Sequence, residues 1–243
     1  MVSPAYLHLL ENGELERRAK LAAEHLLRCD LCPWECKSDR IAGLGGICHT
    51  GALAQVHSYR PHLGEEDPLR GSHGSGTIFF SGCNLCCQYC QNYAISQTVD
   101  GRRVDAADLA AIMLELQAIG CHNINLVTPS HVTAQILAAV MIAAQAGLRL
   151  PLVYNTGGYD APLGHGRSRA LQPLVDPVLG EQPFAADART GDSPLTHQIV
   201  DLAFLDPEID GYFLGVHQVG HGSIRRPVRN RLCLRWERKA ARH

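Results

Sequence analysis

Cysteine is the residue type through which this sequence could do chemistry. Ten cysteines occur in 243 residues, and eight of them form two groups: Cys29, Cys32, Cys36 and Cys48, then Cys83, Cys86, Cys87 and Cys90. The N-terminus, MVSPAYLHLLENGELERRAK, has a charged amphipathic pattern and not the basic start and apolar core of an export signal, which predicts a cytoplasmic protein. Because the cytosol keeps thiols reduced, metal binding or thiol chemistry is expected instead of disulfides.

The second cysteine group predicts an iron–sulfur cluster. Cys83, Cys87 and Cys90 are spaced C-x3-C-x2-C and could supply three thiolates from one loop. A [4Fe–4S] cluster normally takes four thiolates, so three would leave one iron open to a substrate or cofactor. Cys86 keeps other interpretations open, because the four cysteines also form two abutting C-x2-C pairs. These could be zinc ligands, a thioredoxin-like dithiol or inert thiols.

The first cysteine group is a compact set of four metal ligands. Four thiolates could close a structural zinc site or hold a second iron–sulfur cluster, and the spacing does not choose between them. Buried free thiols are the remaining interpretation. The glycines before Cys48 would let the chain turn back toward the other three cysteines.

A repeated strand and helix pattern positions both groups and predicts the fold class. Apolar residues at helical spacing predict a helix over residues 5–27, and residues 53–59 have the pattern of a short strand. Beyond a loop at 60–76, strands at 77–80, 124–128 and 150–155 alternate with helices at 105–119 and 132–146. Asp105 should cap the first of these helices and Gly120 should end it. Such units in series predict an α/β fold with parallel strands and crossover helices.

Polar and reactive residues follow each of the three later strands. They are SGCNLCCQYCQN after the first, Thr128 to His131 after the second, and Thr156 to Tyr159 after the third. Because parallel strands end at one edge of a sheet, we expect these segments to face a single rim. His131 could reach a cofactor there or be a structural histidine. In the loop before the first of these strands, His62, Glu65 and Glu66 could touch a substrate or be merely solvated.

Three segments together resemble radical SAM proteins related to the pyruvate formate-lyase activating enzyme. They are GSGTIFFSGCNLCCQYCQNYAISQ, INLVTPSH and LVYNTGGY, and the likeness extends from about Cys29 to Asp160. The resemblance implies a partial (β/α) barrel and a [4Fe–4S] cluster on the C-x3-C-x2-C cysteines. It also implies that the amino and carboxylate groups of S-adenosylmethionine chelate the open iron. Such a protein is an oxidoreductase that cleaves this cofactor reductively to a 5′-deoxyadenosyl radical for hydrogen abstraction.

The same resemblance implies a set of cofactor-binding residues. Tyr89 occupies the place of the family's aromatic residue before the last cysteine. Thr128 stands where the family often has a Gly-Gly-Glu turn that receives the methionyl amine. The residues carried over in this way are Tyr89, Asn125, Thr128, Asn155, Thr156 and Gly157.

The predicted organisation has three parts. Residues 1–50 form an N-terminal helix and a cysteine-rich metal knuckle, and residues 51–160 form the radical SAM core. Residues 161–243 lose the strand and helix pattern, and no lysine occurs between Lys37 and Lys239, where relatives have a lysine that seats the cofactor. We therefore expect a barrel that is incomplete at its C-terminus and a final region that is divergent or poorly ordered. A shifted reading frame is one hypothesis for that region.

The partners follow from the resemblance and from the charge of the chain. The resemblance implies an electron donor such as flavodoxin or ferredoxin, and it leaves a protein substrate and a small-molecule substrate open. The formal charge of -2 and a longest apolar run of nine residues predict neither a nucleic-acid nor a membrane partner. Two functions remain as hypotheses. One is a radical SAM enzyme, with a glycyl-radical activase as one form, and the other is a catalytically impaired iron–sulfur or zinc-binding scaffold.

Overall fold

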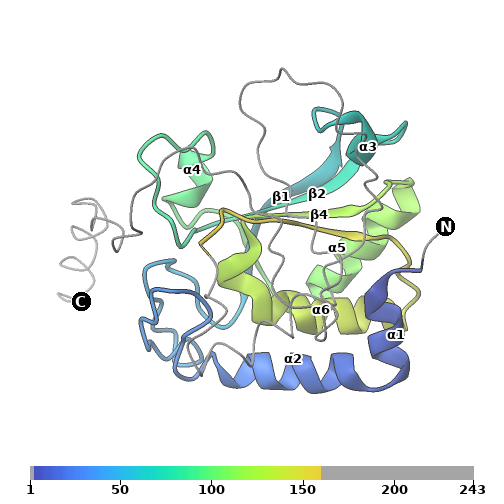
Figure 1. Cartoon of the computed structure of the whole chain (residues 1–243). Coiled ribbons are helices and arrows are strands. Elements are labelled where there is room, and N and C mark those ends of the chain that lie inside the picture. Colours follow the sequence, from blue (N-terminus) through green and yellow to red (C-terminus); the bar gives the residue numbers. More distant parts are fainter. Residues whose placement is uncertain (1–2, 160–243) are drawn as a thin grey trace, which may run out of the picture.

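The computed structural model of the chain describes residues 3–159, which form a mixed five-stranded sheet with helices against it (Figure 1). The strands lie in the order β3-β1-β2-β4-β5. Their bounds are Ala54–His62 (β1), Ser75–Phe80 (β2), Arg102–Val104 (β3), Ile124–Val127 (β4) and Leu152–Asn155 (β5). β2, β4 and β5 are parallel, which confirms the parallel strands predicted from the sequence. β1 pairs antiparallel with β2 and with β3, a short strand that the sequence analysis did not predict.

Seven helical segments connect and flank the strands. Their bounds are Ala5–Glu11 (α1), Glu14–Glu24 (α2), Asp67–Arg70 (α3), Tyr93–Ser96 (α4), Ala106–Ile119 (α5), Pro129–Val132 (η1, a 3-10 turn) and Thr133–Gln145 (α6), counted among residues 3–159. The single helix predicted over residues 5–27 is wrong, because Gly13 adopts a left-handed φ of 76° and divides it into α1 and α2. α5 has the predicted limits, since the Asp105 side chain accepts the N–H of Asp108 and Gly120 ends the helix with a φ of 97°.

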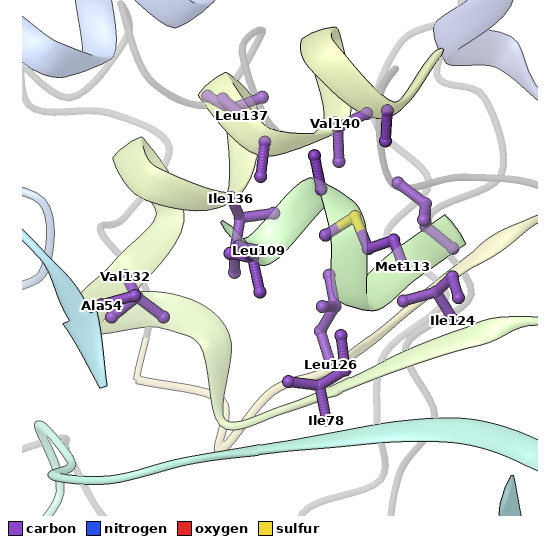
Figure 2. Packing of buried hydrophobic residues seen from close by; sticks show 14 of the residues in the cluster. Ala54, Ile78, Leu109, Met113, Ile124, Leu126, Val132, Ile136, Leu137 and Val140 are labelled. Atoms are coloured by element: carbon purple, nitrogen blue, oxygen red, sulfur yellow. The ribbon is translucent and has the colours of Figure 1, made fainter. Parts of the chain in front are cut away.

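The core lies between the sheet and the two crossover helices. α5 and α6 lie on the same side of the sheet, and α2 packs against α6 as an outer layer (Figure 1). Strand residues meet helix residues there in a buried apolar cluster that includes Ile78, Ile124, Leu126, Leu109, Met113, Ile136, Leu137 and Val140 (Figure 2). Because successive strand residues face opposite sides, Ile124 and Leu126 point into this cluster and Asn125 points to the other face. The core therefore fixes which side chains of β4 are left for the far face of the sheet.

The carboxyl ends of the three parallel strands are in register. Phe79 of β2 pairs with Val127 of β4, which pairs with Asn155 of β5. The three segments that follow these strands consequently leave the sheet at one rim, as predicted. The partial (β/α) barrel stays a prediction, because further strands, the expected lysine position and the whole of residues 161–243 lie outside the described residues. No helix within residues 3–159 has the length and apolar character needed to cross a bilayer.

Candidate metal centre at the strand ends

The second cysteine group occupies the loop between β2 and α4. The loop is held at its start by two backbone hydrogen bonds. The N–H of Ser81 donates to the carbonyl of Gln55, and the N–H of Gly82 donates to that of Ile95, both at 2.9 Å. Cys83 then lies buried just past the end of β2, Cys87 is exposed, and Cys90 is half-buried. β2 therefore places the first of the three thiols at the rim, with the other two toward solvent.

Hydrogen-bond donors face two of these three thiols. The backbone N–H of Leu85 donates to Cys83 Sγ at 3.4 Å, and the hydroxyl of Ser96 donates to Cys90 Sγ at 3.3 Å. Donors of this kind stabilise a thiolate bound to iron. Burial raises the pKa of Cys83 and of Cys87, and the neighbouring thiol groups add to the increase because like charges disfavour one another. Metal binding at this loop must therefore displace thiol protons.

Cys86 has a different environment from the other three cysteines of the loop. Its backbone is left-handed, with a φ of 49°, and its Sγ lies 3.9 Å from the carbonyl oxygen of Cys83. Besides burial, the thiols of Cys87 and Cys90 both raise the pKa of Cys83. Because the Cys86 sulfur is directed at the Cys83 carbonyl, the loop favours the C-x3-C-x2-C set over two C-x2-C zinc pairs.

The side chains are not yet arranged around a common centre. Within residues 3–159, no three His, Cys, Asp or Glu side chains converge closely enough to hold a metal ion as they stand. Cluster binding therefore requires the thiols to rotate inward, which the exposure of Cys87 and the partial exposure of Cys90 permit. By residue type, number and hydrogen-bond donors, the loop fits a cluster with three thiolate ligands.

Four of the predicted cofactor-binding residues meet beside this loop. The N–H of Thr128, after β4, donates to the carbonyl of Asn155 at the end of β5, at 2.8 Å. Thr156 Oγ1 lies 3.4 Å from the hydroxyl of Ser130. A Cβ added at Gly157 would lie only 2.3 Å from Leu85 Cδ1, so this glycine lets the β5 turn pack directly on the cysteine loop. The rim is thus one continuous surface of the cysteine loop and two strand ends.

Thr128 carries backbone strain at this rim. Its φ of 53° and ψ of 54° are left-handed values, which are rare for a β-branched residue. Strain of this kind persists where the surrounding structure fixes it, and it is common at functional sites. The conformation turns the chain from β4 into η1.

The other two predicted cofactor-binding residues do not join this group. The side chain of Tyr89 is fully exposed (100%). Asn125 is buried inside β4, where its Nδ2 donates to Glu65 Oε1 at 3.2 Å, and Glu65 Oε1 lies 3.4 Å from His62 Nδ1. Cofactor contacts by Tyr89 and Asn125 stay predictions. The hydrogen bond between Asn125 and Glu65 does place Glu65, and His62 beside it, against the polar face of the sheet. These are two of the three residues of the 60–76 loop that could touch a substrate.

His131 has the structural role that the sequence left open. Its ring is buried, and its two nitrogens lie 3.1 Å from the carbonyl oxygens of Thr128 and Ser81. Burial lowers the pKa of His131 to about 4, so the ring is neutral near pH 7. The neutral ring has one N–H, so it donates to one of these carbonyls and packs against the other, between η1 and the start of the cysteine loop.

The sequence analysis missed the contact between the two cysteine groups. Trp34, which lies between Cys32 and Cys36, donates its indole N–H to the carbonyl of Asn84 at 2.5 Å. Asn84 Nδ2 in turn donates to the carbonyl of Tyr159 at 2.8 Å, and the rings of Trp34 and Tyr159 meet edge to face at 6.1 Å. The two cysteine-bearing loops lie at the same end of the molecule (Figure 1). No spacing in the sequence could signal this contact, because 34 residues separate Cys48 from Cys83.

Comparison with known proteins agrees with a cluster in this loop. A family described as a 4Fe-4S single cluster domain matches residues 70–154, a range that contains the whole second cysteine group. Residues 70–154 thus match a 4Fe–4S cluster domain, of a kind found in radical SAM-like proteins, which is consistent with an iron–sulfur protein.

One relative and the solved structures complete the comparison. The chain is 28% identical over 184 residues to an uncharacterized protein of Methanocaldococcus jannaschii, an alignment that covers 73% of this chain and 52% of that protein. The chain therefore spans about half the length of the relative it matches. No solved structure matches the chain.

Proposed function

We propose that the protein is a radical SAM enzyme, with a [4Fe–4S] cluster on Cys83, Cys87 and Cys90 and S-adenosylmethionine at the iron that lacks a thiolate. The observation that carries the proposal is the position of the cysteine loop. It leaves the carboxyl end of a parallel strand and packs on the turn after β5 through Leu85 and Gly157. Parallel α/β sheets hold their ligands at this edge. The three-cysteine resemblance and the matched cluster domain support the same assignment.

The residues around the loop support the binding of a polar, charged cofactor. Asn155, Thr156 and Ser130 supply side-chain amide and hydroxyl groups at the ends of β4 and β5. The rim residues named here carry no carboxylate, so in this proposal the amino group of the cofactor is bound mainly by iron and by neutral oxygens. The buried start of the loop at Cys83 excludes water from one side of the site, which protects a radical from quenching.

The chemistry that the cluster would supply is a one-electron reduction. Held by Cys83, Cys87 and Cys90, a reduced cluster would supply the electron for cleavage of the S–C5′ bond of S-adenosylmethionine into methionine and a 5′-deoxyadenosyl radical, which would abstract hydrogen from the substrate. An electron donor such as flavodoxin or ferredoxin would restore the reduced cluster. Exposed Cys87 lies on the side of the loop that such a donor could approach.

Anaerobic reconstitution of the full chain with iron and sulfide tests the proposal. The expected product binds about four irons per chain at the three-cysteine loop. Reduction in the presence of S-adenosylmethionine should then release 5′-deoxyadenosine. Separate Cys83→Ser, Cys87→Ser and Cys90→Ser variants should each lose the cluster and the product.

Cys86→Ser is the matched control, because it removes a neighbouring thiol of the same loop whose sulfur faces the backbone. It should keep both iron and 5′-deoxyadenosine release. A stable cluster that never cleaves the cofactor would instead identify a scaffold that has lost turnover. Equal iron content in Cys86→Ser and Cys87→Ser, or zinc in place of iron at this loop, would refute the ligand assignment.

A further inference from the structure

The first cysteine group forms one set of interacting thiols. Cys29, Cys32 and Cys48 are buried, and Cys36 is exposed. Cys36 Sγ lies 4.0 Å from the carbonyl oxygen of Cys29, and a Cβ added at Gly46 would lie 2.3 Å from the same sulfur. Cys32 interacts electrostatically with Cys48 and Cys36. The two segments that carry the four cysteines therefore lie against each other, although within residues 3–159 no three of these sulfurs are close enough to hold a metal ion before the side chains rotate.

The backbone around these thiols is held in unusual conformations. The N–H of Cys29 donates to the carbonyl of Ser38 at 2.9 Å, and the N–H of Lys37 donates back to the carbonyl of Cys29 at 2.8 Å. The residues on both sides of Cys36 and the residue after Cys48 are left-handed, with φ values of 41° (Glu35), 56° (Lys37) and 54° (His49). The two backbone hydrogen bonds hold Cys29 beside the segment that follows Cys36.

Arg40 is a buried cation beside Cys29 of this group. Its side chain is among the largest fully buried ones in residues 3–159, at 1% exposure. Nη1 lies 3.8 Å from Cys29 Sγ and donates to the carbonyl of His131 at 2.8 Å, and Nε donates to the carbonyl of Gly51 at 3.2 Å. Nη2 is buried without a hydrogen-bond partner. Among the described residues no carboxylate forms an ion pair with it, since the acidic residues in ion pairs are Glu14, Glu16, Asp30, Glu35, Glu65 and Asp67, each paired elsewhere.

A buried guanidinium with no anion beside it is unfavourable by several kcal/mol, of the order of the desolvation cost of one ion. Neutral thiols do not offset this cost. Four thiolates around one divalent ion do, because the centre then carries a net charge of about −2. An anionic centre formed by the four cysteines would therefore offset the cost of burying the Arg40 guanidinium.

We propose that Cys29, Cys32, Cys36 and Cys48 bind a single zinc ion as a tetrathiolate centre, and that the buried Arg40 is its counter-ion. Close packing favours one ion over a second cluster. A Cβ added at Gly46 would lie only 2.3 Å from Cys36 Sγ, so the segment before Cys48 already lies against this thiol. A single zinc ion with Zn–S distances of about 2.3 Å needs less room there than a cubane of four irons and four sulfides. Binding draws the four sulfurs inward to coordinating distance.

Arg40 also links this centre to the rim. The same guanidinium nitrogen that faces Cys29 holds the carbonyl of His131, in the η1 turn directly after β4. Gln135 of α6 adds a second link, since its Nε2 donates to the carbonyls of Gly51 and Ala52. Arg40 is therefore a positioning residue. The zinc centre balances the charge of its guanidinium, and the guanidinium holds the η1 turn in place.

Metal analysis of the full chain tests the zinc centre without any measurement of radical chemistry. Protein purified anaerobically from zinc-containing medium should hold one zinc per chain, whether or not the second loop carries iron. The Cys32→Ser and Cys36→Ser variants should lose zinc and keep iron, and Cys121→Ser, which removes a buried cysteine outside both groups, should keep both. Because Cys36 is exposed, its variant tests the ligand even if Cys32→Ser fails to fold. Absence of zinc, or about eight irons per chain, would overturn the proposal.

Competition with a chromogenic chelator tests the counter-ion. Arg40→Met should weaken zinc binding by about tenfold or more, the usual range for a group that supports a metal site from outside its ligand shell. Arg40→Lys keeps the charge and should recover part of the affinity. Arg18→Met is the matched control, because Arg18 is also buried but has Glu14 as its partner. Equal affinities for the Arg40→Met and Arg18→Met proteins would exclude Arg40 as the counter-ion.

Discussion

Gly82, at the start of the second cysteine loop, packs against Cys48 of the first cysteine group, and its substitution by alanine measures how tightly the two segments are packed. Gly82 has a φ of 78°. A Cβ at this position would lie 2.5 Å from the carbonyl oxygen of Cys48 and 3.2 Å from Thr50 Oγ1. Since real Cβ atoms do not approach backbone oxygen this closely, one of the two loops has to move.

Two terms set the expected loss of stability for Gly82→Ala. A left-handed backbone costs a residue with a Cβ about 1 to 2 kcal/mol, partly offset because alanine restricts the unfolded chain more than glycine does. Overpacking against a fixed backbone adds about 1 to 3 kcal/mol. The free energy of unfolding should therefore fall by about 2 to 4 kcal/mol.

Gly13→Ala is the control, because it has the same backbone angle and none of the contact. Gly13 has a φ of 76°, and an added Cβ would meet nothing within 4 Å. The free energy of unfolding of the Gly13→Ala protein should fall by only about 1 kcal/mol. Urea unfolding of both variants beside the unsubstituted protein, all with the same metal content, gives the comparison. If the two variants agree within about 0.5 kcal/mol, the additivity error of such measurements, the close packing of the two loops is refuted.

Three further substitutions test the fold and the buried histidine. Asp105→Ala removes the side chain that accepts the Asp108 N–H at 2.8 Å, and urea unfolding should show a loss of about 1 kcal/mol. Leu126→Ala leaves a cavity at a fully buried position of β4 and should cost about 2 to 5 kcal/mol by the same assay, whereas a loss below about 1 kcal/mol would contradict the packing. His131 has a folded pKa of about 4, below its value of about 6.5 in an unfolded chain, so its stabilisation is full above pH 6.5 and is lost as the pH falls toward 4. The difference in unfolding free energy between the unsubstituted protein and His131→Gln should therefore shrink by up to about 3 kcal/mol over that range, and a constant difference would show that the ring does not titrate there.

The fold was predictable wherever local signals agreed with tertiary packing. Asp105 and Gly120 mark the ends of α5 because a cap and a left-handed stop act within a few residues of the chain. The prediction of one helix over residues 5–27 was wrong because it overlooked a local signal of this kind at Gly13. Its leucines keep helical spacing across Gly13, and periodicity alone does not report that this glycine turns left-handed. β3 escaped prediction because it has three residues and two of them, Arg102 and Arg103, are exposed.

The rim of the site was predictable for a different reason. Parallel strands bring their carboxyl ends together whatever residues follow, so the order of strands in the sequence was enough to place Thr128, Asn155 and Gly157 beside the cysteine loop. The direction of single side chains was not accessible in this way. Tyr89 lies in the loop itself, where no ladder of hydrogen bonds fixes its orientation, and the structure turns it to solvent.

Arg40 shows what a sequence cannot convey about a charged residue. In the segment KSDRIAG it has the surroundings of an ordinary solvated arginine. Its meaning comes from the burial of its guanidinium beside Cys29 and from the lack of a carboxylate partner among the described residues. A cation in that position is stabilised by an anion, and the proposed zinc centre supplies one in its metal-bound thiolates. Because the same guanidinium holds the carbonyl of His131, the two cysteine groups are parts of one structure, and loss of metal from the knuckle should loosen the turn after β4 on which the rim depends.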